Sequence, residues 1–244
     1  MASTGSLERT RLSGMKTLGL IGGMSWESTA TYYRALNEGV RDRVGGLHSV
    51  PLLMWSFDFA VIEDCQMRGD WDQATRLMVD AAERLEGAGA DGLMICTNTM
   101  HRMADDIESR VDVPLVHIAD ATAVGIQQHG CHSPLLLGTR FTMEQAFYKG
   151  RLQSHHGIDV VMPNEADRAV VHRISDDELC QGQVLEASRE AYKGVIDAGV
   201  RAGADGVIFG CTEIGLLLSQ DDLDEPAFDT TVLHVQAGLE FMIN

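Results

Sequence analysis

Short apolar runs along the chain alternate with longer segments in which apolar residues recur every three or four positions. The first pattern is typical of buried parallel strands, and the second is typical of helices with one apolar face. Their alternation predicts an α/β fold in which helices cover both faces of mainly parallel sheets. The expected strands are residues 17–22, 51–57, 92–97, 114–119, 134–139, 158–163, 206–211 and 231–235.

Amphipathic helices are expected between these strands. The segment 25–44 opens at Ser25 and the segment 70–89 opens at Asp70. Both residue types accept hydrogen bonds from the free amides of a first helical turn, and glycine at 87 or 89 would end the second of these helices. Segments 142–157 and 186–203 are expected to form the corresponding helices later in the chain.

The chain carries a near-copy of one of its own segments. The sequence "GADGLMICTNTMH" starts at Gly89, and "GADGVIFGCTEIG" starts 114 residues later at Gly203. Matches at nearly constant offset indicate a duplicated βα unit. The further pairs, at offsets of 116 and 117, are Gly22 with Gly138, Tyr32 with Tyr148, and His117 with His234.

The duplication predicts two similar halves related by a pseudo-twofold axis, each a mainly parallel four-stranded sheet flanked by helices. The strand at 114–119 lies near mid-chain and its counterpart lies near the C-terminus, so the last segment is expected to cross back to the first half. We therefore expect a first half of residues 15–119 with 225–244 and a second half of residues 120–224. Residues 1–14 are polar and are expected to form a flexible extension.

The composition excludes several classes of protein. A net charge of −17 disfavours binding to nucleic acid and to anionic membranes, which require clustered Lys and Arg. No run of about 18 apolar residues is present, so no transmembrane helix is expected. The five cysteines are odd in number and lack the C-x-x-C spacing, which disfavours a disulfide framework and a ribbon-type zinc site and favours a reducing cytoplasm.

Polar residues gather where four of the expected strands end, with "GGMS", "TNTMH", "GTRFT" and "GCTE" following alternate strands. In open α/β sheets the ligand lies beyond these carboxyl ends. The repeat sets Thr97 opposite Cys211, so a small ligand is expected in the cleft between them. The "GGMS" turn lacks the G-x-G-x-x-G spacing of dinucleotide-binding loops, which disfavours binding of a cofactor phosphate. A tight turn whose backbone amides face a carboxylate is favoured instead, with Met24 and Ser25 at the border of the site.

Cys211 precedes "TEIG", an expected helix start. A helix N-terminus lowers the pKa of a thiol, which makes Cys211 a candidate base or nucleophile, although a buried inert cysteine fits the residues equally well. Cys96 stands one position earlier in the repeat and is expected to pack in the core. His101, His117 and His234 lack zinc-site spacing, so no metal is expected, and the last two are expected to be structural.

The motifs "CTNTMH" and "GCTEIG", in a chain that begins its first strand with "LGLIGGMSWEST", resemble those of the aspartate/glutamate racemase family. They are most similar to its bacterial branch of L-aspartate/glutamate racemases, and the resemblance covers residues 15–244. In this family two cysteines flank the substrate and invert Cα without pyridoxal phosphate or metal. The resemblance implies a cofactor-independent, cytoplasmic isomerase that makes D-amino acids and forms a homodimer.

Inversion of a stereocentre by proton exchange needs a base on one face and an acid on the other. Thr97 stands where the two-cysteine members carry their first cysteine, and the similar branch carries the same Thr/Cys pair. A threonine hydroxyl is a poor resting base. The resemblance therefore implies that Cys211 takes the Cα proton from the L-isomer and that Thr97 serves the opposite face, with slower use of the D-isomer.

The resemblance also implies a set of substrate-binding residues, which are Met24, Gln66, Asn98, Thr99, Thr139, Thr212 and Glu213. For Gln66 an exposed position at a helix start is an equal alternative, and Glu213 is expected to act on neighbouring amides or to cap its helix. The two-cysteine relatives hold the side-chain carboxylate of the substrate with a cation. Arg140 and Arg168 are only candidates for it, so acidic substrates come from the resemblance alone.

Two other functions fit the same residues. A single-cysteine lyase or decarboxylase of this superfamily protonates an enolate from one face, which a chain with only Cys211 could do. A non-catalytic amino-acid sensor would keep the fold and lack one of the two thiols, and saturable binding without turnover would support it. Deuterium exchange at Cα separates the racemase from both alternatives, because neither of them exchanges that proton.

Overall fold

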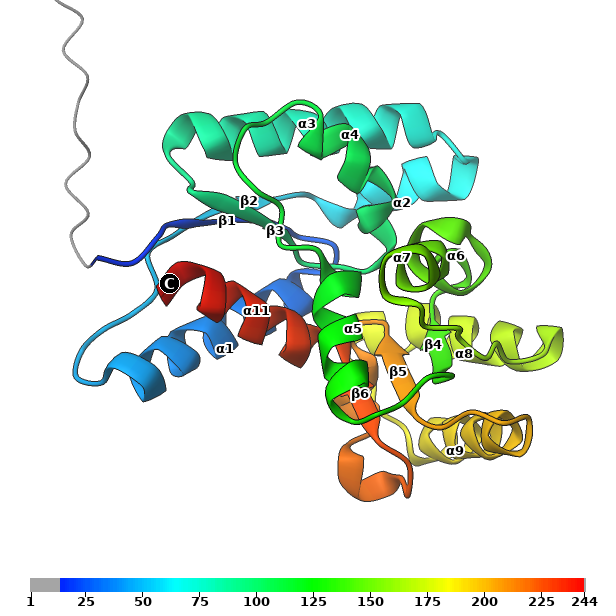
Figure 1. Ribbon diagram of the computed structural model, residues 1–244. Helices are drawn as coiled ribbons and strands as arrows, with labels where there is room; N and C mark the ends of the chain where they lie inside the picture. The colour runs from blue at the N-terminus through cyan, green and yellow to red at the C-terminus, as the bar shows by residue number, and fades with distance from the viewer. Residues whose placement is uncertain (1–13, 244) are drawn as a thin grey trace, which may run out of the picture.

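The computed structural model describes residues 14–243, so residues 1–13 of the expected extension lie outside the described part. Within that part the strands form two parallel three-stranded sheets (Figure 1), ordered β2-β1-β3 and β4-β5-β6. The first sheet consists of β1 (Leu18–Gly22), β2 (Leu52–Ser56) and β3 (Gly92–Ile95). The second consists of β4 (Leu135–Gly138), β5 (Val207–Gly210) and β6 (Ala227–Asp229).

The expectation of four-stranded sheets is only partly met. The segments 114–119 and 158–163 each make one parallel bridge, Leu115 to Leu93 and Val161 to Leu135, at an edge of a sheet. The first of them cannot continue as a strand because the chain enters a helix at Ile118. The short apolar segments therefore extend each sheet without forming a regular fourth strand.

The strand expected at 231–235 is wrong, because these residues belong to helix α11 (Thr230–Ile243). The carboxylate of Asp229 accepts hydrogen bonds from the amides of Thr231 at 2.8 Å and Val232 at 3.2 Å, which starts the helix. A short, continuous apolar run fits a buried helix as well as a strand. The strand lies just before it, at 227–229, so His234 is not the structural counterpart of His117.

The helices that follow the strands lie on both faces of each sheet (Figure 1). Ser25 and Asp70 accept hydrogen bonds from the amides of Ser28 and Gln73, which confirms both expected helix starts. The segment 142–157 breaks at Gln145, whose backbone is extended, into two helices. The helices are α1 (Trp26–Val44), α2 (Phe59–Arg68), α3 (Trp71–Ala88), α4 (Ala104–Glu108), α5 (Ile118–Gln128), α6 (Arg140–Glu144), α7 (Ala146–His156), α8 (Glu165–Asp177), α9 (Glu186–Arg201), α10 (Ile214–Leu217) and α11, with short 3-10 turns η1 (Thr99–Met103), η2 (Leu179–Gln181) and η3 (Gln220–Asp222).

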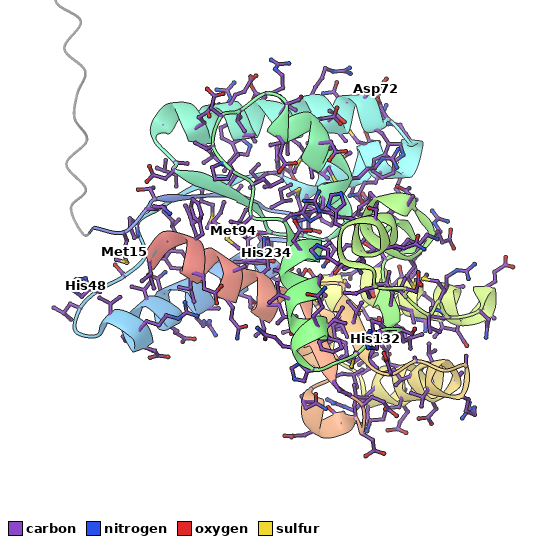
Figure 2. All side chains as sticks on the ribbon, viewed as in Figure 1. Met15, His48, Asp72, Met94, His132 and His234 are labelled. Carbon is purple, nitrogen blue, oxygen red and sulfur yellow. The ribbon has the colours of Figure 1, made fainter. Side chains whose placement is uncertain are left out.

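Helices α5 and α11 are exchanged between the two halves and pack against each other in the middle of the molecule (Figure 1). Helix α11 follows the second sheet but covers the first, where its Leu239 shares a core with Leu20 and Met94. Helix α5 follows the first sheet but covers the second, where Ile126 packs with Leu136. Figure 2 shows Met94 and His234 in the interior where β3 and α11 meet.

Two counterpart tyrosines attach these exchanged helices. Tyr32 of α1 and Tyr148 of α7 are fully buried, and each belongs to the half that receives the exchanged helix. The hydroxyl of Tyr32 bonds to Nδ1 of His234 at 2.8 Å, and that of Tyr148 donates to Oγ1 of Thr122 at 3.1 Å. The two halves are therefore interlocked. Within the described residues no helix combines the length and apolarity needed to cross a bilayer.

Candidate active site

A small cavity lies where the carboxyl ends of β3 and β5 meet, and both halves of the chain line it. Its volume is about 40 Å³, so it is a narrow cavity. The lining side chains come from the turns after the strands and from α2, α6, α8 and η2. They are Phe59, Gln66, Thr97, Asn98, Thr99, Thr139, Phe141, His172, Asp176, Cys180, Cys211, Thr212 and Glu213, with Gly210.

The structure thus brings Thr97 and Cys211 to one cavity, as the repeat predicted. Thr97 lies in the bend after β3 and is half-buried, whereas Cys211 directly follows β5 and is 6% exposed. Cys96 is fully buried in the core between the first sheet and α11, as expected. No group of three or more His, Cys, Asp or Glu between residues 14 and 243 is arranged to hold a metal ion.

Glu213 is the centre of a hydrogen-bond network that joins the two halves. Its Oε2 accepts from Sγ of Cys211 at 3.1 Å and from Oγ1 of Thr212 at 2.8 Å. Its Oε1 accepts from Oγ of Ser25 at 2.8 Å and from Oγ of Ser28. Glu213 makes no side-chain cap of α10, because its carboxylate is taken up by the thiol and three hydroxyls.

The environment of Cys211 raises its pKa well above the ordinary thiol value of 9.0. The largest cause is the hydrogen bond with the thiol of Cys180, followed by burial and by the negative charge of Glu213. The expected lowering by a helix N-terminus is wrong, because α10 has only four residues and these stronger effects oppose its dipole. Cys211 therefore rests as a neutral thiol with a carboxylate beside it.

Hydroxyls from both halves form a second cluster at the cavity wall. Oγ1 of Thr99, after β3, lies 3.0 Å from Oγ1 of Thr139, after β4. Thr139 also accepts from the amide of Thr142 at 3.3 Å and so starts α6. These side chains can rotate to donate to an incoming carboxylate, because each hydroxyl is both a donor and an acceptor.

Two polar atoms of the cavity residues are buried without a hydrogen-bond partner, and they are Oδ1 of Asn98 and Nδ1 of His172. The amide nitrogen of Asn98 is engaged, since it donates to Oγ1 of Thr230 at 3.0 Å. An orphaned polar atom costs free energy unless a ligand satisfies it. The carbonyl of Asn98 is an acceptor that suits an ammonium group.

The remaining expected residues are distributed unevenly. Gln66 lies in the last turn of α2, where its amide donates to Sδ of Met100 at 3.2 Å, so the helix-start alternative is wrong. Met24 is buried in the core beside the first sheet and does not line the cavity. Arg140 is exposed over the ring of Phe141, and Arg168 is paired with Glu144 at 3.2 Å. No Lys or Arg is among the lining residues of the described cavity.

Sequence reasoning missed several residues that contribute to this site. Ser28 stands three positions after the expected cap Ser25, so its place on the first turn of α1 was visible in the sequence. Its contact with Glu213, 185 residues away, was not. Cys180 and His172 belong to the α8–η2 segment, which shows no sequence match to the first part of the chain and therefore gave no signal.

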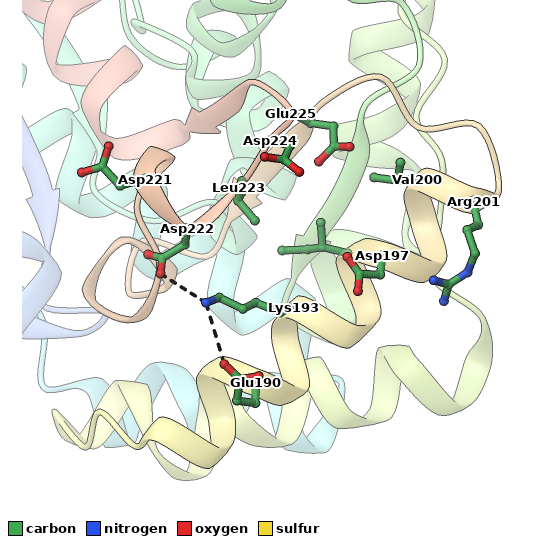
Figure 3. A pocket seen from close by; sticks show the side chains of 11 residues that line it. Glu190, Lys193, Asp197, Val200, Arg201, Asp221, Asp222, Leu223, Asp224 and Glu225 are labelled. Carbon is green, nitrogen blue, oxygen red and sulfur yellow. Dashed lines mark ion pairs between the residues drawn. The ribbon is translucent and has the colours of Figure 1, made fainter.

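A larger groove of about 500 Å³ lies between α9 and η3 (Figure 3). Its wall is rich in carboxylates, and Nζ of Lys193 pairs with Asp222 at 3.5 Å and with Glu190 at 3.8 Å. None of the described residues that line it carries a thiol or hydroxyl, and none comes from a turn at the carboxyl end of a strand. Solvated charges on a surface explain this groove, and the smaller cavity remains the candidate active site.

Comparison with known proteins identifies the family to which this chain is similar. A profile of the family Asp/Glu/Hydantoin racemase matches residues 21–238. A Yersinia pestis protein assigned to the Asp/Glu racemases is 52% identical, with a TM-score of 0.87 over 93% of this chain and 99% of its own. An aspartate racemase homologue from Pyrococcus horikoshii is 34% identical, with a TM-score of 0.80, and the match covers 93% of this chain and 98% of the homologue. The broad-specificity amino-acid racemase RacX of Bacillus subtilis is 22% identical over 88% of this chain and 92% of its own.

Proposed function

Because the chain belongs to the Asp/Glu/Hydantoin racemase family, we propose that it inverts Cα of L-aspartate, L-glutamate or a similar small amino acid without a cofactor. Cys211 and Thr97 serve the two faces of Cα. The observation that carries this proposal is the cavity itself, which is lined by the thiol side chain after β5 and the hydroxyl side chain after β3. A pair of proton-transfer groups from opposing strand ends is what inversion by proton exchange requires.

The first step uses Cys211 together with Glu213. The thiol rests protonated, so it must release its proton before it can act as a base. Oε2 of Glu213 lies 3.1 Å from Sγ and accepts that proton while Sγ takes the proton from Cα. The Cα–H bond breaks, its electron pair stays on the substrate as an enolate, and the net negative charge moves from the carboxylate to the substrate.

The second step uses Thr97 as an acid. A hydroxyl donates a proton to a strongly basic carbanion more readily than it removes one from Cα, so Thr97 is suited to protonate the enolate that forms from the L-isomer. The hydroxyl proton goes to the second face of Cα, and the proton held by Glu213 then returns through water to the Thr97 oxygen, which restores both groups. Removal of a proton from the D-isomer by Thr97 is correspondingly slow.

The walls of the cavity supply the binding groups. The unpartnered carbonyl of Asn98 suits the substrate ammonium. The hydroxyls of Thr99 and Thr139 suit the α-carboxylate, where donors also stabilise the charge that builds up as the proton leaves. Because no lining residue is a Lys or Arg, neutral side chains belong in any substrate screen beside the acidic ones.

A racemisation screen without added cofactor tests this function. The purified protein is incubated in deuterated water with L-aspartate, L-glutamate, L-homoserine and neutral L-amino acids, and both isomers are recovered by chiral chromatography. A racemase forms the D-isomer with deuterium at Cα. Loss of a carboxylate without Cα exchange would instead identify a decarboxylase, and saturable binding without turnover would identify a sensor.

A further inference from the structure

His101 connects the bend that carries Thr97 to the start of helix α5. Its Nδ1 lies 2.8 Å from the carbonyl oxygen of Thr97, and its Nε2 lies 3.2 Å from the amide nitrogen of Ile118. The side chain is 2% exposed. Both ring nitrogens are therefore committed inside the protein, one to each segment.

These partners fix the tautomer of the ring. A carbonyl oxygen only accepts and an amide N–H only donates, so Nδ1 carries the hydrogen and Nε2 carries the lone pair. Burial, followed by the proximity of His117 and His234, holds the pKa of His101 well below its ordinary value of 6.5. The ring stays neutral at physiological pH, and only the neutral ring can donate to one partner and accept from the other.

The repeat explains why one half needs this side chain. At the offset of 114 residues, His101 stands opposite Gly215, just as Thr97 stands opposite Cys211. The carbonyl of Cys211 is held by the backbone, because it accepts from the amide of Ile214 at 3.0 Å. The carbonyl of Thr97 is held by the imidazole instead. The two copies therefore differ at two related positions: Thr97 replaces the cysteine, and His101 replaces the glycine and binds the Thr97 carbonyl.

We propose that His101 is the positioning residue of Thr97. By fixing the Thr97 carbonyl to the start of α5, it keeps the hydroxyl directed at its face of Cα, and it has no part in proton removal by Cys211. This inference rests on the proposed racemase function. His101 would then affect formation of the D-isomer without affecting proton removal from the L-isomer, although it touches neither the substrate nor Cys211.

Two rates measured in one deuterium experiment separate these steps. With an L-substrate in deuterated water, uptake of deuterium into the recovered L-isomer reports the Cys211 face, and formation of the D-isomer reports transfer at the Thr97 face. In His101→Ala we expect D-isomer formation to fall about 10- to 100-fold, because small misplacements of a catalytic group carry such costs. Uptake into the L-isomer should persist or rise, because the enolate now returns to Cys211.

His129 offers a matched control. Its Nδ1 lies 2.9 Å from the carbonyl oxygen of Gly125, four positions earlier in the chain. His101 bonds to Thr97 across the same spacing, but His129 lies at the C-terminal end of α5. His129→Asn should leave both rates unchanged. If His101→Ala does not fold, His101→Gln becomes the test, since its amide keeps one donor and one acceptor and should give a partial fall in D-isomer formation alone.

The outcomes distinguish this inference from the function on which it rests. Equal falls in both rates for the folded His101 variant, or no change in either, would overturn the positioning role while leaving the racemase assignment in place. If the wild-type protein neither forms D-isomer nor takes up deuterium, the proposed function itself fails. A selective loss of D-isomer formation supports the inference.

Discussion

The thiol of Cys211 donates to Oε2 of Glu213 across 3.1 Å, and the other carboxylate oxygen is held by serines of the opposite half. Ser25 and Ser28 start helix α1, which directly follows the first strand of the chain. The carboxylate that accepts from Cys211 is therefore held by residues that follow β1 as well as by residues that follow β5.

Replacing Glu213 by glutamine tests its role as proton acceptor. The amide keeps the shape of the side chain but cannot take the Cys211 proton, so we expect racemisation to fall about 100- to 1,000-fold. The measurement is kcat for D-isomer formation, with thermal melting as a check on folding. Glu144→Gln, at an exposed residue paired with Arg168, is the matched control and should keep full activity. Activity of Glu213→Gln within threefold of wild type would rule out this role.

The raised pKa of Cys211 predicts an alkaline-sided pH dependence. The thiolate fraction at neutral pH is small and grows as pH rises, so alkylation of Cys211 by iodoacetamide should be slow at pH 7 and still be accelerating above pH 9. Cys180→Ala removes the largest cause of the shift and should speed the alkylation of Cys211 at pH 8. Peptide mass spectrometry follows the modification of this residue. An unchanged rate in Cys180→Ala would show that the neighbouring thiol does not set the pKa.

Thr97 predicts different turnover numbers in the two directions. The equilibrium constant of racemisation is 1, so kcat/KM must be equal for the two isomers, and the asymmetry must appear in kcat and KM separately. We expect the larger kcat, matched by a proportionally larger KM, with the L-isomer. Thr97→Cys should keep activity and narrow the difference in kcat. Equal kcat values in the wild-type enzyme would count against a threonine on the second face.

The buried histidines predict loss of stability in mild acid. Burial is the main cause that lowers the pKa of His117 to about 2 and of His234 to about 4, and it also lowers that of His101. Below the ordinary value of 6.5, the unfolded chain binds protons that the folded chain cannot, so stability falls as pH decreases. Each histidine lowers the free energy of unfolding by about 1.4 kcal/mol for each pH unit below 6.5. This decrease stops near pH 4 for His234 and near pH 2 for His117, where the folded protein also binds the proton.

Urea unfolding between pH 7.5 and pH 5 measures this slope. His234→Gln keeps a donor for the carbonyl of Val116 and an acceptor for Tyr32, and it should reduce the slope by about one third, as expected when one of three histidines is removed. A free energy of unfolding that stays level from pH 7 to pH 5 would contradict the neutral, buried state of these rings.

Much of the fold could be predicted because local patterns determine it. The repeat located Thr97 and Cys211 at equivalent strand ends, and the caps at Ser25 and Asp70 follow from side-chain chemistry alone. The error at 231–235 arose because a short apolar run has no period that separates a buried strand from a buried helix. The real strand, Ala227–Asp229, is too short and too polar to be recognised.

The parts of the site that escaped prediction depend on contacts between distant residues. Glu213 was expected to act on neighbouring amides or to cap its own helix, and only the packing of distant segments shows that Ser25 and Ser28 hold it. The pKa of Cys211 was assigned the wrong direction for the same reason, since Cys180 lies 31 positions away in a segment without a repeat partner. The spacing of residues along the chain does not reveal contacts between residues that only the fold brings together.

The proposal that Cys211 and Thr97 exchange protons on opposite faces of Cα is tested most directly by Cys211→Ala and Thr97→Ala in deuterated water with an accepted L-substrate. The wild-type enzyme should place deuterium at Cα of both isomers. Cys211→Ala should place it in neither, and Thr97→Ala should place it in the recovered L-isomer without forming the D-isomer. Continued formation of deuterated D-isomer by Cys211→Ala would contradict the account.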